Sequence, residues 1–213
     1  MGAGDRKARA ESTKEKLLEA GLEVFAEKGF EGARVEEIAR RAGVNIRMLY
    51  HHFRSKEGLF LKVVEGMHKE IQARQDAVFR TEAPPFELLT QAIEDLFDFL
   101  GRNPSFVKIL GWLSLSGGRR GPLPEVGKDY ALRVVRPRME ELARSGAWNG
   151  AVDPLFAILM CWSLSVFWFL NRGEFHSMVE AGTPLEKDRA YLDQVLALLE
   201  GGLLGKSSKE GRE

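Results

Sequence analysis

Hydrophobic residues recur along the chain with a spacing close to 3.6 residues, and no stretch alternates with a period of two for long. The first spacing is typical of α-helices with one apolar face, whereas the second would indicate half-buried strands. The sequence therefore predicts an all-α protein, in which capping residues, glycines and prolines mark the helix ends.

Capping residues predict the bounds of the first helix. Ser12 and Glu15 have the spacing of a capping box, which places the helix start at Ser12. Gly29 is suited to a left-handed C-cap at the other end. The expected apolar stripe of this helix consists of Leu18, Leu22 and Phe25, flanked by Leu17 and Val24.

Three further helices are expected to follow closely. A short helix over 35–42 ends at Gly43, because a residue without Cβ can take a positive φ and reverse the chain. Asn45 is a good N-cap for a third helix over 46–53. Ser55 is a good N-cap for a fourth, which runs on through LKVVEGMHKEIQARQ.

Beyond Pro84 and Pro85 the pattern predicts five more helices. Three of them start with an N-cap residue followed by a proline at the first helical position: Asn103–Pro104, Asp153–Pro154 and Thr183–Pro184. The other two are FELLTQAIEDLFDFLG at 86–101 and a helix over 125–145 that Pro137 bends. The Gly-rich stretch 116–122 predicts a loop.

At 213 residues the chain can form one large domain or two small ones with real cores. Its one cysteine, Cys161, excludes an intrachain disulfide and a cysteine-built zinc site and favours a reducing, cytoplasmic setting. The apolar stretch 155–170 is 16 residues long, fewer than the roughly 20 that span a bilayer. A buried helix is therefore expected there, and no membrane partner.

Positive charge concentrates near the N-terminus. Residues 1–56 hold 12 Lys and Arg against 9 Asp and Glu, a net charge of +3, and the rest of the chain has a net charge of −3. Between residues 34 and 56 the cations are Arg34, Arg40, Arg41, Arg47, Arg54 and Lys56. A local basic surface on a protein of zero net charge indicates one region that faces a polyanion.

The helices over 35–42 and 46–53 are joined by a three-residue turn, which is the layout of a helix-turn-helix. Its apolar positions can all point inward, toward the first helix: Ile38, Ala39, Val44, Leu49 and Phe53. Arg47, Tyr50 and His51 are then left facing outward. A helix offered in this way fits the major groove of DNA, where its first residues meet base edges.

From Ser12 to Phe60 the sequence resembles the DNA-binding domain of the TetR family of bacterial transcriptional regulators. The residues that carry the resemblance are AGLEVFAEKGFEG, VEEIARRAGV and LYHHFRSKEGLF. The resemblance implies a three-helix DNA-binding domain over 1–56 and a larger helical ligand-binding and dimerisation domain over 57–205. Residues 206–213 are expected to form a frayed tail.

Eight residues are expected to contact DNA: Arg34, Asn45, Ile46, Arg47, Tyr50, His51, His52 and Lys56. The resemblance implies that Tyr50, His52 and Lys56 contact the phosphate backbone. For Lys56, the positive N-terminal end of the fourth helix would help to hold the phosphate.

The resemblance also implies base contacts from Ile46, Arg47 and His51, to which Tyr50 can add. At two places the chain departs from the family pattern. Arg34 stands where the family often has a threonine, and Arg47 with Met48 replaces a small or hydroxyl-bearing pair. Arg34 can still reach a phosphate, but the usual hydroxyl-to-phosphate contacts cannot be assumed. Arg47 can read guanine with two hydrogen bonds.

Other kinds of site are less well supported by the sequence. His51 and His52 diverge by about 100° on a helix and cannot ordinarily share one metal ion. Cys161 lies in a nearly all-apolar helix, where a thiol is usually inert. No enzyme activity, metal or cofactor is therefore expected. The competing interpretation is a non-catalytic helical ligand-binding or scaffold protein with an incidental basic face.

The helix that starts at Asp153 is apolar on two opposite sides. One stripe holds Leu155, Ile158, Trp162, Val166 and Phe169, and the other holds Phe156, Met160, Leu164 and Phe167. The last helix offers a companion stripe of Leu192, Val195, Leu196 and Leu199. The second stripe and its companion resemble the family's intersubunit four-helix bundle. Which stripe faces a partner stays open, and burial inside a monomer is the alternative.

The resemblance implies two partners besides a second copy of the chain. The first is double-stranded DNA with a palindromic operator, since a two-fold dimer reads two half-sites. The second is a small effector that relieves repression by favouring the DNA-incompetent shape. Six aromatic residues could line its cavity or simply fill the core: Phe97, Phe106, Trp112, Tyr130, Trp162 and Phe169. If several line a cavity, the effector is largely apolar.

Overall fold

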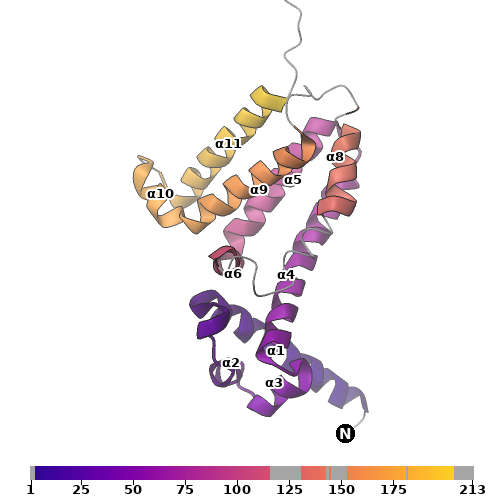
Figure 1. Cartoon of the computed structure of the whole chain (residues 1–213), viewed down its shortest axis with the longest axis vertical. Coiled ribbons are helices and arrows are strands. Elements are labelled where there is room, and N and C mark those ends of the chain that lie inside the picture. The colour runs from indigo at the N-terminus through magenta and orange to yellow at the C-terminus, as the bar shows by residue number, and fades with distance from the viewer. Residues whose placement is uncertain (1–2, 116–130, 143, 145–152, 181, 204–213) are drawn as a thin grey trace, which may run out of the picture. The chain divides into compact units, whose positions relative to one another are not determined.

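The computed structural model describes residues 3–115, 131–142, 144, 153–180 and 182–203. All regular elements in these ranges are helical, which confirms the all-α prediction (Figure 1). They are α1 (Ala3–Gly32), α2 (Val35–Ala42), α3 (Ile46–Phe53), α4 (Lys56–Phe79), α5 (Pro85–Arg102), α6 (Pro104–Leu115), η1 (Ala131–Val135), α8 (Arg136–Leu142), α9 (Pro154–Leu170), α10 (Arg172–Met178) and α11 (Pro184–Leu203).

The chain divides into two compact units. Unit 1 comprises residues 1–70 and 103–126, and unit 2 comprises residues 71–102 and 127–213. Unit 1 therefore contains α1 to α3, the first part of α4 and α6, and unit 2 contains the other helices. The functional division expected at residue 56 rests on a different criterion and stays a prediction.

The first helix starts earlier than expected. α1 begins at Ala3 and runs through Ser12, so the prediction that Ser12 caps the helix is wrong. Ala8, Ala10 and the long charged side chains around them all favour helix, and nothing in that stretch stops it. Gly29 has the expected positive φ, 69°, and breaks the helical conformation, but its ψ of 178° lies outside the left-handed helical region and α1 is assigned as far as Gly32. The predicted left-handed C-cap is therefore correct in φ only.

The buried face of α1 is rotated relative to the expected stripe. Leu17 and Val24 are fully buried with Phe25, whereas Leu18 and Leu22 are only half-buried. Small residues such as Gly21 lie on this buried face, and a search for large hydrophobic residues overlooks them. At Gly21 an added Cβ would lie 3.2 Å from the side chain of Leu59, so its absence lets α4 approach closely.

Within unit 1, α6 is fastened to α1 through Trp112. The indole Nε1 of Trp112 donates a hydrogen bond to the carbonyl of Ala26 at 3.3 Å. The ring also lies against Gly29, where an added Cβ would come within 3.0 Å of it. Phe106 and Ile109 on the same helix are buried, which adds an apolar contribution to this contact.

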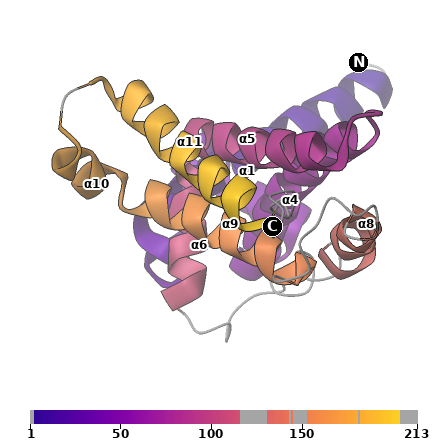
Figure 2. The same cartoon turned by 90° about the horizontal axis from the view of Figure 1, so that it is seen from above.

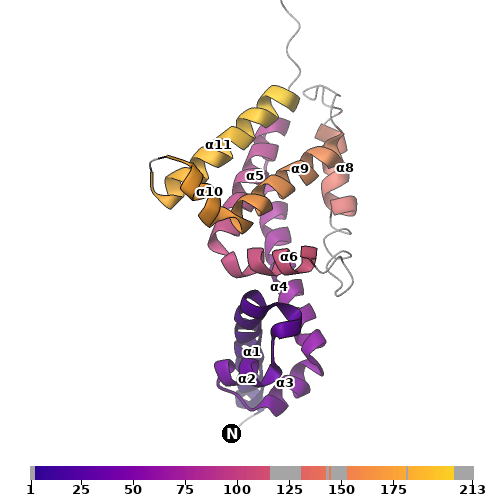
Figure 3. The same cartoon turned by 60° about the vertical axis from the view of Figure 1, so that its left-hand side comes forward.

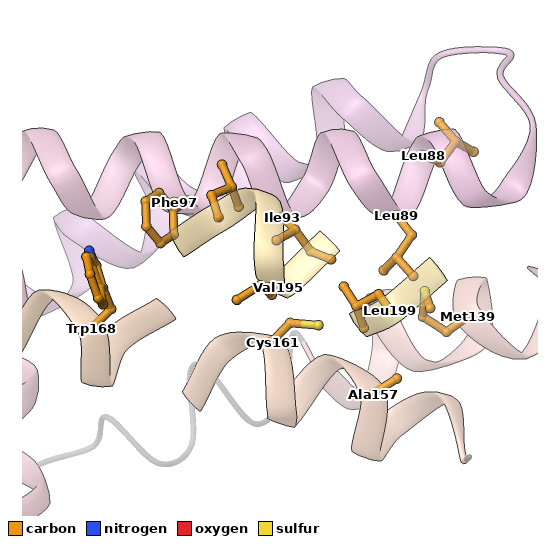
Figure 4. Close-up of a cluster of buried hydrophobic side chains, with 11 residues drawn as sticks. Leu88, Leu89, Ile93, Phe97, Met139, Ala157, Cys161, Trp168, Val195 and Leu199 are labelled. Atoms are coloured by element: carbon orange, nitrogen blue, oxygen red, sulfur yellow. The ribbon is translucent and has the colours of Figure 1, made fainter. Parts of the chain in front are cut away.

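The core of unit 2 is built mainly from three helices, α5, α9 and α11, which lie together in Figure 2. Figure 4 shows side chains of these helices and of α8 pointing toward one another. The buried cluster consists of Leu88, Leu89, Ile93, Phe97, Met139, Ala157, Cys161, Trp168, Leu192, Val195 and Leu199.

The buried line of α9 differs from both stripes predicted for it. It consists of Ala157, Cys161, Ser165 and Trp168, whereas Leu155, Ile158, Trp162, Val166 and Phe169 are half-buried. Small residues on this line allow the neighbouring helices to pack closely. Burial raises the pKa of the Cys161 thiol to about 11, which agrees with an inert cysteine.

Most helices of unit 2 start where the sequence predicts, but some elements of this unit were not predicted or are described only in part. Asp153 accepts hydrogen bonds from the first turn of α9, and Thr183 forms a capping box with Glu186. The short helix α10 was not expected. The helix predicted over 125–145 is described only in part, as η1 and α8, which follow each other without a break. Pro137 lies just after η1, where the chain changes from a π-helix to an α-helix. The predicted loop 116–122 and tail 206–213 lie outside the described residues.

Among the described residues, no single helix is long and apolar enough to cross a membrane. α9 and α10 reach the required length only as a pair, and they are bent by 85° relative to each other.

One buried carboxylate holds α9, α10 and α11 together. Asp188 of α11 accepts a hydrogen bond from Nε1 of Trp168 at 2.8 Å and pairs with Nε2 of His176, also at 2.8 Å. Arg172 adds an ion pair to the same carboxylate. Because the Asp188 side chain is only 7% exposed, water cannot replace these partners.

We expect Asp188→Asn to lower the free energy of unfolding by about 2 kcal/mol, since Arg172 and the buried indole of Trp168 lose their shared anion. The control is Asp193→Asn on the same helix, whose carboxylate pairs with Arg189 at 2.9 Å in an exposed position. That change should cost about 0.5 kcal/mol or less. Urea unfolding followed by circular dichroism measures both, and equal effects would contradict the role given to Asp188.

Candidate nucleic-acid interface

The turn between α2 and α3 is set by Gly43. Its backbone is left-handed, with a φ of 66° and a ψ of 31°, as predicted. The amide of Gly43 donates to the carbonyl of Arg40 at 3.2 Å, and that of Val44 donates to Ala39 at 3.0 Å. These bonds satisfy carbonyls at the end of α2 and reverse the chain within three residues.

The start of α3 also follows the prediction. The side chain of Asn45 accepts a hydrogen bond from the amide of Arg47 at 2.9 Å and so caps the helix. At the other end, Ser55 accepts from the amide of Gly58 at 3.0 Å and caps α4. Figure 3 shows α2 and α3 beside α1 in unit 1.

Burial divides α3 into two sides. Leu49 and Phe53 are buried, together with Ile38 and Ala39 of α2, whereas Val44 is only half-buried. The residues exposed on the other side are Asn45, Arg47, Tyr50 and His51, and 48% of the Tyr50 surface is accessible. The outward face predicted from the sequence is therefore present, with Ile46 half-buried at its edge.

His52 lies differently from its neighbour. Its ring is half-buried and meets that of His51 nearly edge-on, with 5.1 Å between ring centroids. Its Nε2 is buried, with no hydrogen-bond partner among the described residues. Burial lowers the pKa of His52 below its usual value, and the charges of His51 and Lys14 lower it further. His52 therefore offers DNA a neutral, partly covered imidazole near neutral pH.

Two of the cations in the basic stretch are used inside unit 1. Arg41 bridges α2 to α1 through a hydrogen bond from Nη1 to Glu27 at 2.7 Å, and its Nη2 also donates to Glu37 of α2 at 2.9 Å. The hydrogen bond from Arg41 lowers the pKa of Glu27, and both bonds raise the pKa of Arg41. The pKa of Glu37 is lowered first by a hydrogen bond from Lys28 and then by the one from Arg41. Nζ of Lys56 donates to the carbonyl of Ala33 at 3.1 Å.

The other cations of the stretch are available to a partner. Arg34, Arg40, Arg47 and Arg54 are exposed, and their guanidinium groups form no ion pair with the residues that the structure describes. Arg34 precedes α2 without capping it. Counting charges along the sequence could not separate these four arginines from Arg41 and Lys56.

The residues predicted to bind an effector are not brought together. Phe97 and Phe169 meet in unit 2 at 4.6 Å between ring centroids, and Trp162 of the same unit is half-buried. Phe106 and Trp112 belong to unit 1, and Tyr130 lies outside the described residues. In unit 1, Trp112 lines an open pocket of about 260 Å³ between α1 and α6, together with Phe25, Phe30 and Phe60.

The two helices predicted to form the dimer interface differ in exposure. On α9 the predicted stripe of Phe156, Met160, Leu164 and Phe167 is exposed. On α11 the prediction fails, because Leu192, Val195 and Leu199 are buried in the core of their own unit and Leu196 packs against it. The exposed large apolar residues of α11 are Leu185 and Leu198.

Comparison with known proteins assigns this arrangement to a family. The family described as "Bacterial regulatory proteins, tetR family" matches residues 17–63, which include the turn and α3. The HTH-type transcriptional repressor NicS of Pseudomonas putida is 31% identical over 179 residues, which cover 83% of this chain and 84% of that protein. The chain belongs to the TetR family.

Solved structures agree on the fold of this TetR-family regulator. The transcriptional regulator FadR from Bacillus subtilis, in complex with stearoyl-CoA, has a TM-score of 0.67 and 22% identity, and the match covers 88% of this chain and 97% of that one. The ketosteroid transcriptional regulator KstR2 of Mycobacterium tuberculosis has a TM-score of 0.68 and 22% identity, and the match covers 91% of this chain and 95% of that one.

Family membership confirms the main functional prediction. The chain is a DNA-binding transcriptional regulator with an N-terminal helix-turn-helix, and not an enzyme. It also rules out the competing interpretation, in which the basic face of a ligand-binding or scaffold protein is incidental.

We expect Gly43→Ala to lower the free energy of unfolding by roughly 1 kcal/mol, because a Cβ is strained at the positive φ of this residue. Neighbouring atoms do not contribute, since none lies within 4 Å of the added Cβ. Gly66→Ala is the matched control. Gly66 lies inside α4 with equally open space around it, so there alanine should stabilise the helix by about 0.5–1 kcal/mol. Thermal unfolding of both variants checks the opposite signs, and a stabilising Gly43→Ala would contradict this account of the turn.

Proposed function

We propose that this regulator is a repressor that binds a palindromic operator as a homodimer and releases it when a small apolar effector binds. The observation that carries the DNA-reading part is the outward face of α3. Arg47, Tyr50 and His51 are exposed on it, and the Gly43 turn and the buried side of the helix fix its direction.

This face suits the major groove of DNA. The guanidinium of Arg47 can donate two parallel hydrogen bonds to O6 and N7 of guanine, and His51 and Ile46 can meet neighbouring base edges. We assign contacts with sugar or phosphate to Tyr50, Asn45 and Arg34, which are all exposed. These assignments fit the early part of α3, which enters the groove in helix-turn-helix proteins.

Lys56 and His52, the two remaining residues predicted to contact DNA, are restricted by their surroundings in the protein. Lys56 already donates to the Ala33 carbonyl and lies 4.5 Å from the centroid of the Phe30 ring. It can still share its other N–H donors with a phosphate, and it would approach that phosphate in a fixed orientation. The ring of His52 is half-buried and its pKa is lowered by burial, so it would meet a phosphate as a neutral imidazole and not as a cation.

Selection of bound sequences from a random pool of duplexes tests this proposal. We expect a palindromic consensus and binding that weakens steeply with salt. Arg47→Ala should relax the preference at one base pair of each half-site, at a loss of discrimination of about 1–3 kcal/mol. Lys108→Ala, which removes an exposed cation of α6, should leave the consensus unchanged. An unchanged consensus with Arg47→Ala would refute the base contact.

The exposed face of α9 supports dimerisation. Phe156 and Phe167 keep 63% and 59% of their surface accessible in a single chain, and Met160 and Leu164 lie between them. Large apolar patches of this kind usually mark an interface. Because the predicted stripe of α11 is buried, the proposed interface rests on the α9 face.

We expect Phe167→Arg to shift the protein to a monomer, because a charge buried in an apolar interface loses its hydration. Its operator affinity should fall with it, since a monomer reads only one half-site. Leu115→Arg is the control: Leu115 is 82% exposed on α6 in unit 1, so the dimer should persist. Sedimentation velocity measures the mass of both variants, and a dimeric Phe167→Arg would argue against this interface.

The chemical class of the effector and the cellular compartment of the protein are also part of the proposal. The structure most relevant here is the FadR complex with stearoyl-CoA, in which the ligand carries a long apolar chain. The aromatic residues of unit 2, Phe97, Trp162 and Phe169, would suit such a chain. We infer that residues 57–205 provide ligand binding and dimerisation, and that the protein works in the cytoplasm, where its DNA is.

A further inference from the structure

Arg54 is an exposed cation directly after α3. Of the six cations between residues 34 and 56, Arg41 and Lys56 are engaged inside unit 1. The guanidinium of Arg54 forms no ion pair or hydrogen bond with the described residues, and the side chain is exposed. Its charge is therefore available to a partner.

The backbone of Arg54 is unusual. With a φ of 66° and a ψ of −35°, it is the one non-glycine residue with a positive φ in the part of the chain that the structure describes. Such a conformation strains any residue that has a Cβ. A glycine at position 54 would remove that strain.

The surrounding corner imposes this conformation. The amide of Arg54 donates to Tyr50 at 2.9 Å, and that of Ser55 donates to Phe53 at 2.8 Å. α4 then starts so close that a Cβ on Gly58 would lie 2.0 Å from the Phe53 carbonyl oxygen. These constraints act on the backbone, so the fold needs a positive φ at position 54 but not an arginine.

The position continues the outward face of α3. Because its amide bonds to Tyr50 as in a regular turn, Arg54 follows Arg47 and His51 at the spacing i, i+4, i+7, which places its Cα on their side of the helix. Arg47 lies near the beginning of that face and Arg54 at its end. A helix whose early residues enter a groove brings its far end toward the backbone at the groove's edge.

We propose that Arg54 is a phosphate contact of the operator, and that an arginine stands at this position, where the backbone favours glycine, because of DNA binding and not because of the stability of the fold. This proposal rests on the DNA-reading role of α3 given above. The guanidinium would bind a phosphate through two parallel, charge-assisted hydrogen bonds. Such a contact adds affinity for all duplexes alike and carries no sequence information.

Three substitutions separate charge from strain. Arg54→Gly removes both, Arg54→Gln removes the charge and keeps the strained backbone, and Arg54→Lys keeps both. We expect Arg54→Gly and Arg54→Gln to weaken operator and random duplexes by the same factor, about fivefold or more at moderate salt. The slope of log Kd against log salt concentration should fall by about one for each half-site. Arg54→Lys should retain most of the affinity.

Thermal unfolding without DNA provides the second readout. Arg54→Gly should raise Tm by about 2–5 °C, whereas Arg54→Gln should leave it unchanged. A variant that is more stable and yet binds DNA less well is not expected of a residue that supports the fold. Lys108→Gln, which removes an exposed cation of α6, is the matched control and should change neither readout.

Two results would overturn the proposal. One is wild-type affinity and salt slope for Arg54→Gln, and the other is a lower Tm for Arg54→Gly. Failure here is distinguishable from failure of the proposed function. If Arg47→Ala alters the selected consensus while Arg54→Gln binds normally, only the role of Arg54 is wrong. If neither substitution affects binding, the DNA-reading role of α3 fails as well.

Discussion

The burial of one side of α3 is the constraint on which the rest of the DNA-binding unit depends. α3 has only two turns, so the burial of Leu49 and Phe53 against α1 and α2 fixes the rotation of the helix about its axis. The directions of its other side chains are thereby fixed too. Arg47 and Tyr50 are then directed outward, although neither side chain has a hydrogen bond or ion pair to the residues that the structure describes. The apolar packing supplies the direction, and the polar side chains supply the chemistry.

Local signals in the sequence were sufficient for most of this unit. Gly43, Asn45 and Ser55 each act on backbone groups within four residues, so their effects do not depend on distant parts of the chain. The same independence explains the error at Ser12. A capping residue ends a helix only where the preceding residues disfavour helix, and those before Ser12 favour it.

Unit 2 was less predictable because the buried face of each of its helices depends on contacts with residues that are distant in the sequence. α9 is apolar on nearly all sides, so its periodicity could not show which line is buried. The line that packs inward contains Ala157, Cys161 and Ser165, whose small size matters more than their hydrophobicity. The burial of α11 residues such as Val195 depends on α5 and α9 together, which no single segment of sequence reveals.

The contact between α6 and α1 restricts position 29 in two independent ways. Its φ of 69° disfavours every residue with a Cβ, and the Trp112 ring occupies the space where a Cβ would stand. Shortening Trp112 would open that space but would leave the torsion angle as it is. A single compensating substitution therefore cannot make room for a side chain at position 29. Even if Trp112 were replaced by a smaller residue, the positive φ would still favour glycine at position 29.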